Sequence, residues 1–248
     1  MESSATVERA LDVLFHLLAS GEASGVTAIG RALSLPKSTV HRLLAALAAR
    51  ALVERDARGR YRLGIGLVAL GLGAQQLEPV VRAARPSLEE QALASGETFF
   101  VVGVRAGRII VLDKVEGTGL LRVAPRVGDT VPIHGTAVGR VLAAFGDGAI
   151  ATLAANPVSS LAAGQAVSAA SPDELREIRE QGYAESFDEW IEGMSALAAP
   201  VWLGDRVVGV IAVAAATPRI IRIGTSALAE RVQSAAAQTG RRLMGATA

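Results

Sequence analysis

Residues 35–50 read LPKSTVHRLLAALAAR, and this stretch decides the fold of the first part of the chain. Pro36 suits a helix start, and apolar side chains then recur at helical spacing at Val40, Leu43, Leu44 and Leu47. The opposite face carries Lys37, Ser38, Thr39, His41 and Arg42. The pattern predicts a helix that buries its leucines and presents a polar, basic face to a partner.

The segments before this stretch complete a helix-turn-helix. Residues 7–18 keep helical apolar spacing, and Thr27 is expected to cap a second, short helix that runs to Leu33. The sequence SLP then breaks the chain, because Pro36 disfavours helical geometry at Leu35. Two helices joined by a tight turn are the arrangement in which the second helix enters the DNA major groove.

A hairpin follows the second helix of this unit. Residues 52–63, LVERDARGRYRL, alternate around a turn at Ala57, Arg58 and Gly59, which predicts the wing of a winged helix-turn-helix. We expect Lys37 and Arg42 to contact phosphate or guanine, and Ser38 and Thr39 to contact phosphate oxygens. Arg58 and Arg60 would lie along phosphates. His41 either joins this surface or stays in solvent.

The local charge separates a DNA reader from an ordinary capped surface helix. The whole chain has 25 Lys and Arg against 24 Asp and Glu, a net of +1. Residues 31–62 hold eight Lys and Arg against Glu54 and Asp56 alone, a net of +6. Positive charge concentrated on one element favours double-stranded DNA as the partner.

The remainder is expected to form a linker helix and an α+β domain. Residues 64–77 are apolar and almost uncharged; glycines 64, 66, 71 and 73 have no phosphate-loop spacing and favour close helix packing in a dimer. Beyond Pro79 the patterns predict an antiparallel sheet with helices on one side. The expected strands are 98–105, 109–116, 120–125, 195–203 and 206–216, and the expected helices are 80–95, one from Thr136, 171–182 with a Ser171–Glu174 capping box, and 218–243.

Composition excludes several classes of function. The chain has no cysteine, and His16, His41 and His134 lack paired-ligand spacing, so neither a metal site nor another cofactor is expected. Residues 10–19 follow Glu8 and Arg9 and read as an amphipathic helix rather than a signal peptide. The apolar run at 194–216 is interrupted by residues 204–206, too early to span a bilayer. These features indicate a soluble, cytoplasmic protein without a membrane partner.

The ordered motifs LSLPKSTVHRLLAALAARALVERD, YRLGIGLVALG, LDKVEG, LRVAPRVGDTVPIHGTAVGRVLAA and AAPV resemble the IclR family of bacterial transcriptional regulators over nearly the whole chain. The resemblance implies a winged helix-turn-helix at 1–63, a linker helix at 64–78 and a GAF-like effector-binding domain at 79–248. It also implies a homodimer or dimer of dimers on a palindromic operator, which represses or activates a catabolic operon. Ala51 replaces the family's usual glycine, so the preceding helix is expected to end differently.

The resemblance also implies an effector pocket. Its matched lining positions are Leu120, Val123, Val131, Ala137, Val138, Ser186, Met194, Ala196, Ala214 and Ala216. Backbone N–H groups at Ala137 and Val138 can hold a carboxylate at a helix N-terminus, with Ser186 and His134 as candidate partners for a second polar group. Alanines 196, 214 and 216 replace polar residues common in the family, which favours a partly apolar effector such as an aromatic acid. Phe187 and Trp190 would cover its ring or simply pack in the core.

Two other functions compete with this interpretation. His134, Asp188 and Glu189 are residue types suited to acid and base catalysis, but no nucleophile motif, metal spacing or phosphate loop accompanies them, so no catalytic residue is expected. A purely architectural DNA-binding protein would leave the second domain, about two thirds of the chain, without a task.

Overall fold

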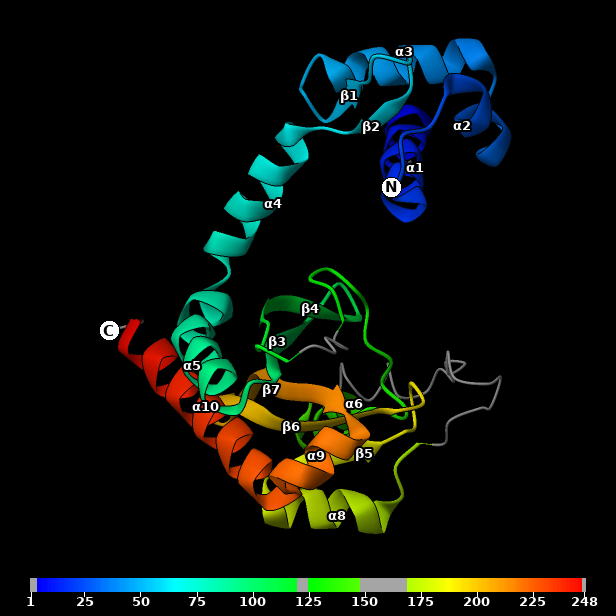
Figure 1. Ribbon diagram of the computed structural model, residues 1–248. Helices are drawn as coiled ribbons and strands as arrows, with labels where there is room; N and C mark the ends of the chain where they lie inside the picture. Colours follow the sequence, from blue (N-terminus) through cyan, green and yellow to red (C-terminus); the bar gives the residue numbers. More distant parts are fainter. Residues whose placement is uncertain (1–3, 120–124, 148–168, 247–248) are drawn as a thin grey trace. The chain divides into compact units, whose positions relative to one another are not determined.

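The computed structural model describes residues 4–119, 125–147 and 169–246 (Figure 1). The chain divides between Leu77 and Glu78 into two compact units. No helix within the described ranges is both long and apolar enough to cross a membrane.

The first unit is a helix-turn-helix with a two-stranded wing and a further helix. Its core holds the apolar face of α3, so the predicted helix and hairpin are confirmed. The elements are α1 (Ala5–Ser20), α2 (Val26–Ala32), α3 (Lys37–Ala48), β1 (Val53–Arg55), β2 (Tyr61–Leu63) and α4 (Ile65–Leu77). The buried core consists of Val13, Leu17, Ile29, Val40, Leu43, Leu44, Leu47 and Val53.

The start of α2 differs from the prediction. Gly25 is the N-cap residue, and no side chain caps the helix, so the expected cap at Thr27 is wrong. Thr27 lies within the first turn and is exposed. The turn before α3 is as tight as expected: Ser34 has a φ of 53°, and the Leu35 amide donates to the Gly30 carbonyl over 2.8 Å.

The turn after α3 keeps the geometry that glycine would allow. Ala51 has a φ of 54°, so the helix does not end differently despite its alanine. The carbonyl of Ala51 accepts the amide of Gly66 over 2.8 Å, and a Cβ on Gly64 would lie 2.2 Å from the same oxygen. Gly64 and Gly66 therefore serve a close contact within one chain, which corrects their assignment to dimer packing. Gly71 has nothing within 4 Å of its Cβ position.

The second unit is built on one five-stranded antiparallel sheet in the order β4-β3-β7-β6-β5. The strands are β3 (Thr98–Arg105), β4 (Arg108–Val115), β5 (Ala184–Phe187), β6 (Met194–Leu203) and β7 (Arg206–Ala216). The helices are α5 (Pro79–Ser95), α6 (Ala137–Phe145), α8 (Pro172–Gln181), α9 (Thr217–Ile223) and α10 (Thr225–Ala246).

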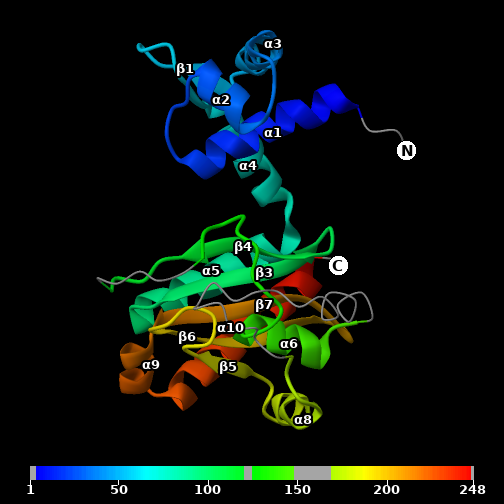
Figure 2. The same cartoon turned by 90° about the vertical axis from the view of Figure 1, so that its right-hand side faces the viewer.

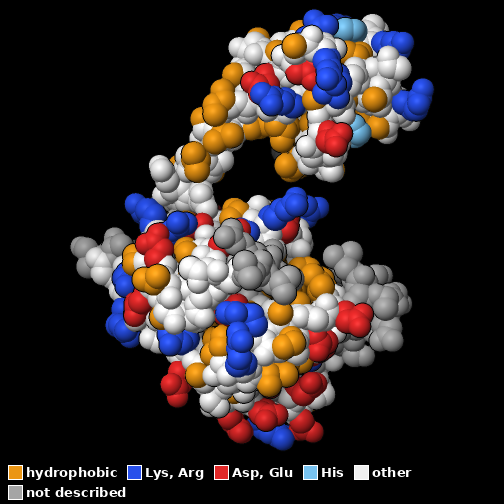
Figure 3. All heavy atoms as spheres, viewed as in Figure 1, with side chains coloured by type: hydrophobic (Ala, Val, Ile, Leu, Met, Phe, Trp, Pro, Cys, Tyr) orange, Lys and Arg blue, Asp and Glu red, His pale blue; other side chains and the backbone are white. Residues whose placement is uncertain are grey.

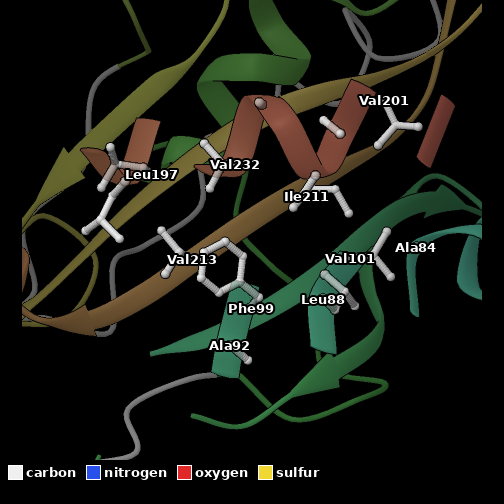
Figure 4. Packing of buried hydrophobic residues seen from close by; sticks show 14 of the residues in the cluster. Ala84, Leu88, Ala92, Phe99, Val101, Leu197, Val201, Ile211, Val213 and Val232 are labelled. Atoms are coloured by element: carbon white, nitrogen blue, oxygen red, sulfur yellow. The ribbon is translucent and has the colours of Figure 1, made fainter. Parts of the chain in front are cut away.

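Helices cover both faces of this sheet, and the prediction of helices on one side is wrong (Figure 2). Helices α5 and α10 pack on one face around Phe99, Leu197 and Ile211, as Figure 4 shows. Helices α6 and α8 pack on the other face. The central strands are buried on both sides, so they are almost wholly apolar and lack the alternation that marks a one-sided sheet.

Most predicted elements of this unit are confirmed, including the Ser171–Glu174 capping box. The sequence patterns missed β5, which has only four residues. The predicted final helix is two helices, because Gly224 has a φ of 96° that no helical residue adopts. Residues 120–124 of the predicted strand 120–125 lie outside the described residues.

Candidate DNA-binding and ligand-binding sites

The first candidate site is the outer face of α3. Lys37, Ser38, His41 and Arg42 are exposed and Thr39 is half-buried, whereas the leucine face is buried in the core. Helical periodicity accounts for this separation, because positions three and four apart share a face. Figure 3 shows Lys and Arg side chains around α3. Within the described residues, Lys37 and Arg42 form no ion pair, so both are available to an anionic partner.

The wing arginines differ in their surroundings. Arg58 is exposed at the turn, but the Arg60 Nε donates to Asp56 Oδ2 over 3.0 Å, and Arg62 pairs with Glu54 over 2.6 Å. The backbone hydrogen bond from Arg60 is the main cause that lowers the pKa of Asp56. Asp56 is therefore ionised at neutral pH, and Arg60 reaches the surface with its charge already paired.

The second candidate site is a small cavity between the sheet and the N-terminus of α6. It has a volume of about 20 Å³, which is room for about one water molecule. A larger ligand must therefore displace lining side chains. The described residues that line it are Phe100, Pro125, Val131, Thr136, Ala137, Val138, Ser186, Trp190, Met194, Ser195, Ala196 and Ala214.

The structure gathers most of the pocket residues that the sequence indicated. Val131, Ala137, Val138, Ser186, Met194, Ala196 and Ala214 all line the cavity. Ala216 lies at the end of β7, where it is the N-cap residue of α9, and does not line it. Leu120 and Val123 lie outside the described residues.

Several lining residues were not anticipated from the sequence. Phe100 pairs with Ala212 in the sheet, so it lies on the same face as Ala214, two residues further along. Strand pairing across distant segments creates this neighbourhood, and no local motif signals it. Pro125, Thr136 and Ser195 complete the unanticipated set.

Hydrogen bonds organise the N-terminus of α6 at the cavity. The Ala137 amide donates to Ser186 Oγ over 3.2 Å, and the Gly139 amide donates to the Thr136 hydroxyl over 2.9 Å. The Val138 amide has no partner among the described residues. No charged side chain is among the lining residues described, so the helix N-terminus supplies the positive potential there.

The aromatic residues proposed to cover a ring lie on opposite faces. Trp190 lines the cavity, whereas Phe187 packs with the cluster beneath α5 and α10. Successive residues of a strand point to opposite faces, so Ser186 and Phe187 cannot both face the cavity. Of the two roles considered for Phe187, packing in the core is therefore the one that the structure shows. His134 is buried but is not among the lining residues.

The three groups considered for catalysis do not form one site. Asp188 accepts hydrogen bonds from the Gly193 amide and the Thr217 hydroxyl. Glu189 pairs with Arg140 through two bonds of 2.7 and 2.8 Å. Neither carboxylate lines the cavity, and both hold neighbouring segments in place. Among the described residues no group of three or more His, Asp or Glu could hold a metal ion.

Comparisons with known proteins agree with this architecture. The family described as IclR helix-turn-helix domain matches residues 6–57, and that described as Bacterial transcriptional regulator IclR C-terminal matches residues 74–241. The Glycerol operon regulatory protein of Streptomyces griseus is 32% identical over 244 residues, covering 96% of each chain. The HTH-type transcriptional regulator XynR of Escherichia coli (strain K12) is 29% identical, also covering 96% of each.

Solved structures show the same fold over almost the whole chain. An IclR transcriptional regulator from Alicyclobacillus acidocaldarius is 28% identical with a TM-score of 0.81, covering 98% of this chain and 100% of that one. An IclR homologue from Microbacterium hydrocarbonoxydans, complexed with 4-hydroxybenzoate, is 20% identical with a TM-score of 0.79 and covers 97% and 100%.

Proposed function

Since this chain belongs to the IclR family of DNA-binding bacterial transcriptional regulators, which are not enzymes, we propose that it regulates a catabolic operon in response to a small organic acid. The protein acts in the cytoplasm as a homodimer or dimer of dimers on a palindromic operator. The favoured effector has an aromatic or otherwise apolar body and one carboxylate.

The cavity at the N-terminus of α6 carries the effector proposal. Its described lining combines mostly apolar side chains and the hydroxyls of Thr136, Ser186 and Ser195 with a helix terminus and no charged group, which suits a single carboxylate at one end of an apolar molecule. The Val138 amide is the first candidate donor, and Ala137 can join it when Ser186 moves. Alanines 196 and 214 offer no side-chain hydrogen bonds to a very small polar acid. The 4-hydroxybenzoate complex of the Microbacterium hydrocarbonoxydans homologue favours the same class.

The small volume of the cavity supports the proposal that an effector changes the conformation of the protein when it binds. About 20 Å³ cannot hold a benzene ring, so an aromatic acid requires the lining to rearrange. A ligand that binds one arrangement more tightly shifts the population toward it, which is the requirement for changing DNA affinity.

Helix α4 supports association of two copies. None of its side chains is buried within the chain, although many of them are apolar. Leu70, Leu72 and Leu77 are 62, 54 and 80% exposed. Figure 3 shows hydrophobic side chains along this helix. Exposed apolar surface on that scale commonly marks a protein interface. Pairing would place two helix-turn-helix units on one palindrome.

Calorimetric titration of the purified protein tests the effector. We expect benzoate and hydroxybenzoate to bind and to change the affinity for DNA, and Ala214→Ser to weaken that binding by placing a hydroxyl beside the ring. Glyoxylate and pyruvate are the comparison ligands. Tight binding of these oxo-acids without any aromatic acid would reject the proposed effector class.

Alanine substitutions test the DNA surface. Arg42→Ala should reduce the preference for the operator over a scrambled duplex, because the recognition helix contacts base edges. Arg58→Ala should weaken binding to the operator and to the scrambled duplex equally, and Arg60→Ala should do so to a smaller extent. Both substitutions should also make the affinity depend less steeply on salt concentration. Identical effects of all three substitutions on both duplexes would show that the assigned face of α3 is wrong.

A further inference from the structure

The wing turn has an acidic residue at a position where DNA would favour a basic one. Residues 56–60 join β1 to β2, with Gly59 at a φ of 77°. The Asp56 amide donates to the Arg60 carbonyl over 2.8 Å, and the Gly59 amide donates to the Asp56 carbonyl over 3.0 Å. These two bonds close the turn but leave other amides to be satisfied.

The Asp56 carboxylate accepts hydrogen bonds from two of these amides. Its Oδ1 accepts the amide of Arg58 over 2.9 Å and the amide of Arg60 over 2.8 Å. Its Oδ2 accepts the Arg60 Nε over 3.0 Å. One side chain thus holds the backbone on both sides of the turn tip and one of the two arginines assigned to phosphate contact. Glu54 offers a contrast, because among the residues that the structure describes its carboxylate bonds only the Arg62 side chain.

We propose that Asp56 is a positioning residue for DNA binding: Oδ1 fixes the turn that presents Arg58, while Oδ2 competes with phosphates for Arg60. The inference rests on the proposed contact between the wing arginines and phosphate. The two oxygens have opposite effects on affinity. Backbone positioning through Oδ1 favours binding, and both the charge and the pairing through Oδ2 oppose it.

Because the two oxygens have opposite effects, the direction in which a substitution changes DNA affinity shows which effect dominates. If Asp56 acted only as a negative charge near DNA, its removal would raise affinity, as for any acidic residue at that surface. If positioning dominates, Asp56→Ala frees the turn and lowers affinity although it removes a repulsive charge. Asp56→Asn separates the two effects, because the amide oxygen can still accept both backbone bonds but the NH₂ group cannot accept from Arg60.

The experiment measures the affinity of the full-length variants for a duplex from their own promoter region and for a scrambled duplex over a range of salt concentrations. We expect Asp56→Ala to bind both duplexes about fivefold more weakly and Asp56→Asn about threefold more tightly. The slope of log affinity against log salt should become steeper by about 0.9 in Asp56→Asn, as one more phosphate contact forms, and shallower in Asp56→Ala.

Glu54→Ala is the matched control, since it removes the same charge from the same hairpin without touching a turn amide. It should raise affinity modestly. An increase in Asp56→Ala equal to that of Glu54→Ala would overturn the proposal, as would Asp56→Asn binding as weakly as Asp56→Ala. The Asn variant keeps the test valid even if the Ala variant unfolds the wing.

Arginine variants distinguish this proposal from the function on which it rests. Arg60→Ala should weaken binding more strongly in the Asp56→Asn background than in the wild type, because Arg60 is then released from its carboxylate. If Arg58→Ala leaves both affinities unchanged, the wing contact itself fails. If Arg58→Ala weakens binding and Asp56→Ala does not, only the role of Asp56 is overturned.

Discussion

The carbonyl oxygen of Ala51 accepts a hydrogen bond of 2.8 Å from the backbone amide of Gly66. This bond joins the turn after α3 to the first turn of α4. The Gly64 amide adds a second bond, 2.9 Å long, to the Leu52 carbonyl. Because the contact is made by backbone atoms at close range, α4 and the end of α3 are fixed to each other within the first unit.

Ala51→Gly should stabilise this junction. Ala51 has a φ of 54°, a conformation that costs alanine about 1 kcal/mol and glycine almost nothing. Part of the gain is offset by the greater freedom of glycine in the unfolded chain, so we expect about 0.5 kcal/mol. Hydrogen exchange of the α3 amides in the full-length protein should slow by about twofold.

Ala49→Gly is the control for that substitution. Ala49 has a φ of −59°, which alanine adopts without strain, so glycine there brings only its entropic cost. The α3 amides of this variant should exchange faster than those of the wild type. Faster exchange in Ala51→Gly as well would contradict the strain argument.

Gly64→Ala should disrupt the same junction from the other side. Its Cβ would lie 2.2 Å from the Ala51 oxygen, a backbone atom that cannot rotate away. Relief of such an overlap typically costs about 1 to 3 kcal/mol. We expect faster hydrogen exchange in the first turn of α4 and weaker DNA binding, with effector binding unchanged.

Gly71→Ala tests helix α4 where space is open. Nothing lies within 4 Å of the added Cβ, so the stability of the helix should be unchanged or should increase by up to about 1 kcal/mol. If two α4 helices pack closely in the dimer, this variant should self-associate more weakly while folding normally. Analytical ultracentrifugation measures that association, and unchanged association would argue against close packing at Gly71.

Local sequence patterns predicted the parts of the fold that depend on interactions between residues close in sequence. The leucine spacing of α3, the hairpin around Gly59 and the Ser171–Glu174 capping box are each readable within a dozen residues. The contact of Gly64 with Ala51 was not, because it joins backbone atoms across an intervening hairpin. The two-sided burial of the sheet was missed for a related reason: the alternation rule assumes that one face meets water.

The same distinction between local sequence patterns and contacts of distant segments applies to the candidate ligand-binding site. The matched motifs placed Ala137, Ser186 and Ala214 around one cavity, although nothing local in the sequence brings these segments together. The role of Phe187 was left open between the pocket and the core, because four-residue β5 was not recognised and its alternation could not be applied. Sequence gives no value for the volume of the cavity, because that volume depends on the packing of side chains from several distant segments.

Glu78→Gln should reduce the stability of the second unit in a pH-dependent way. Glu78 forms two bonds with Arg105, of 3.0 and 2.5 Å, and hydrogen bonding from Arg105 lowers the pKa of the carboxyl below 4.5. The stabilisation is therefore complete above pH 4.5 and is lost as the pH falls through the lower, folded-state pKa. Because both side chains are partly exposed, we expect about 0.5 kcal/mol at neutral pH.

Thermal unfolding of wild type and Glu78→Gln between pH 3 and pH 7 measures this difference. The two melting temperatures should differ at neutral pH and converge toward the acidic end. Arg62 and Glu54 form an exposed pair in the other unit, so Glu54→Gln should not affect the transition of the second unit. A difference for Glu78→Gln that persists at the lowest pH would exclude the ion pair as its cause.

Ser186→Ala should increase the affinity for a carboxylate effector. In the structure the Ser186 Oγ accepts the Ala137 amide over 3.2 Å, so one of the two donors expected to bind the ligand is already engaged. Removing the hydroxyl leaves a buried amide unsatisfied, which costs the ligand-free protein about 1 to 3 kcal/mol. A carboxylate that bridges Ala137 and Val138 recovers part of that free energy. The variant should therefore melt at a lower temperature, be stabilised more by benzoate, and bind it about tenfold more tightly.

The control for Ser186→Ala is Ser195→Ala. Ser195 also lines the cavity, but its hydroxyl lies 2.8 Å from that of Thr217, away from the α6 amides. Its removal should lower stability without changing the affinity for benzoate. Calorimetric titration and thermal unfolding of the three proteins measure both quantities. If Ser186→Ala binds benzoate more weakly than the wild type, the hydroxyl contacts the ligand directly and does not compete with it, because a competitor's removal can only favour binding.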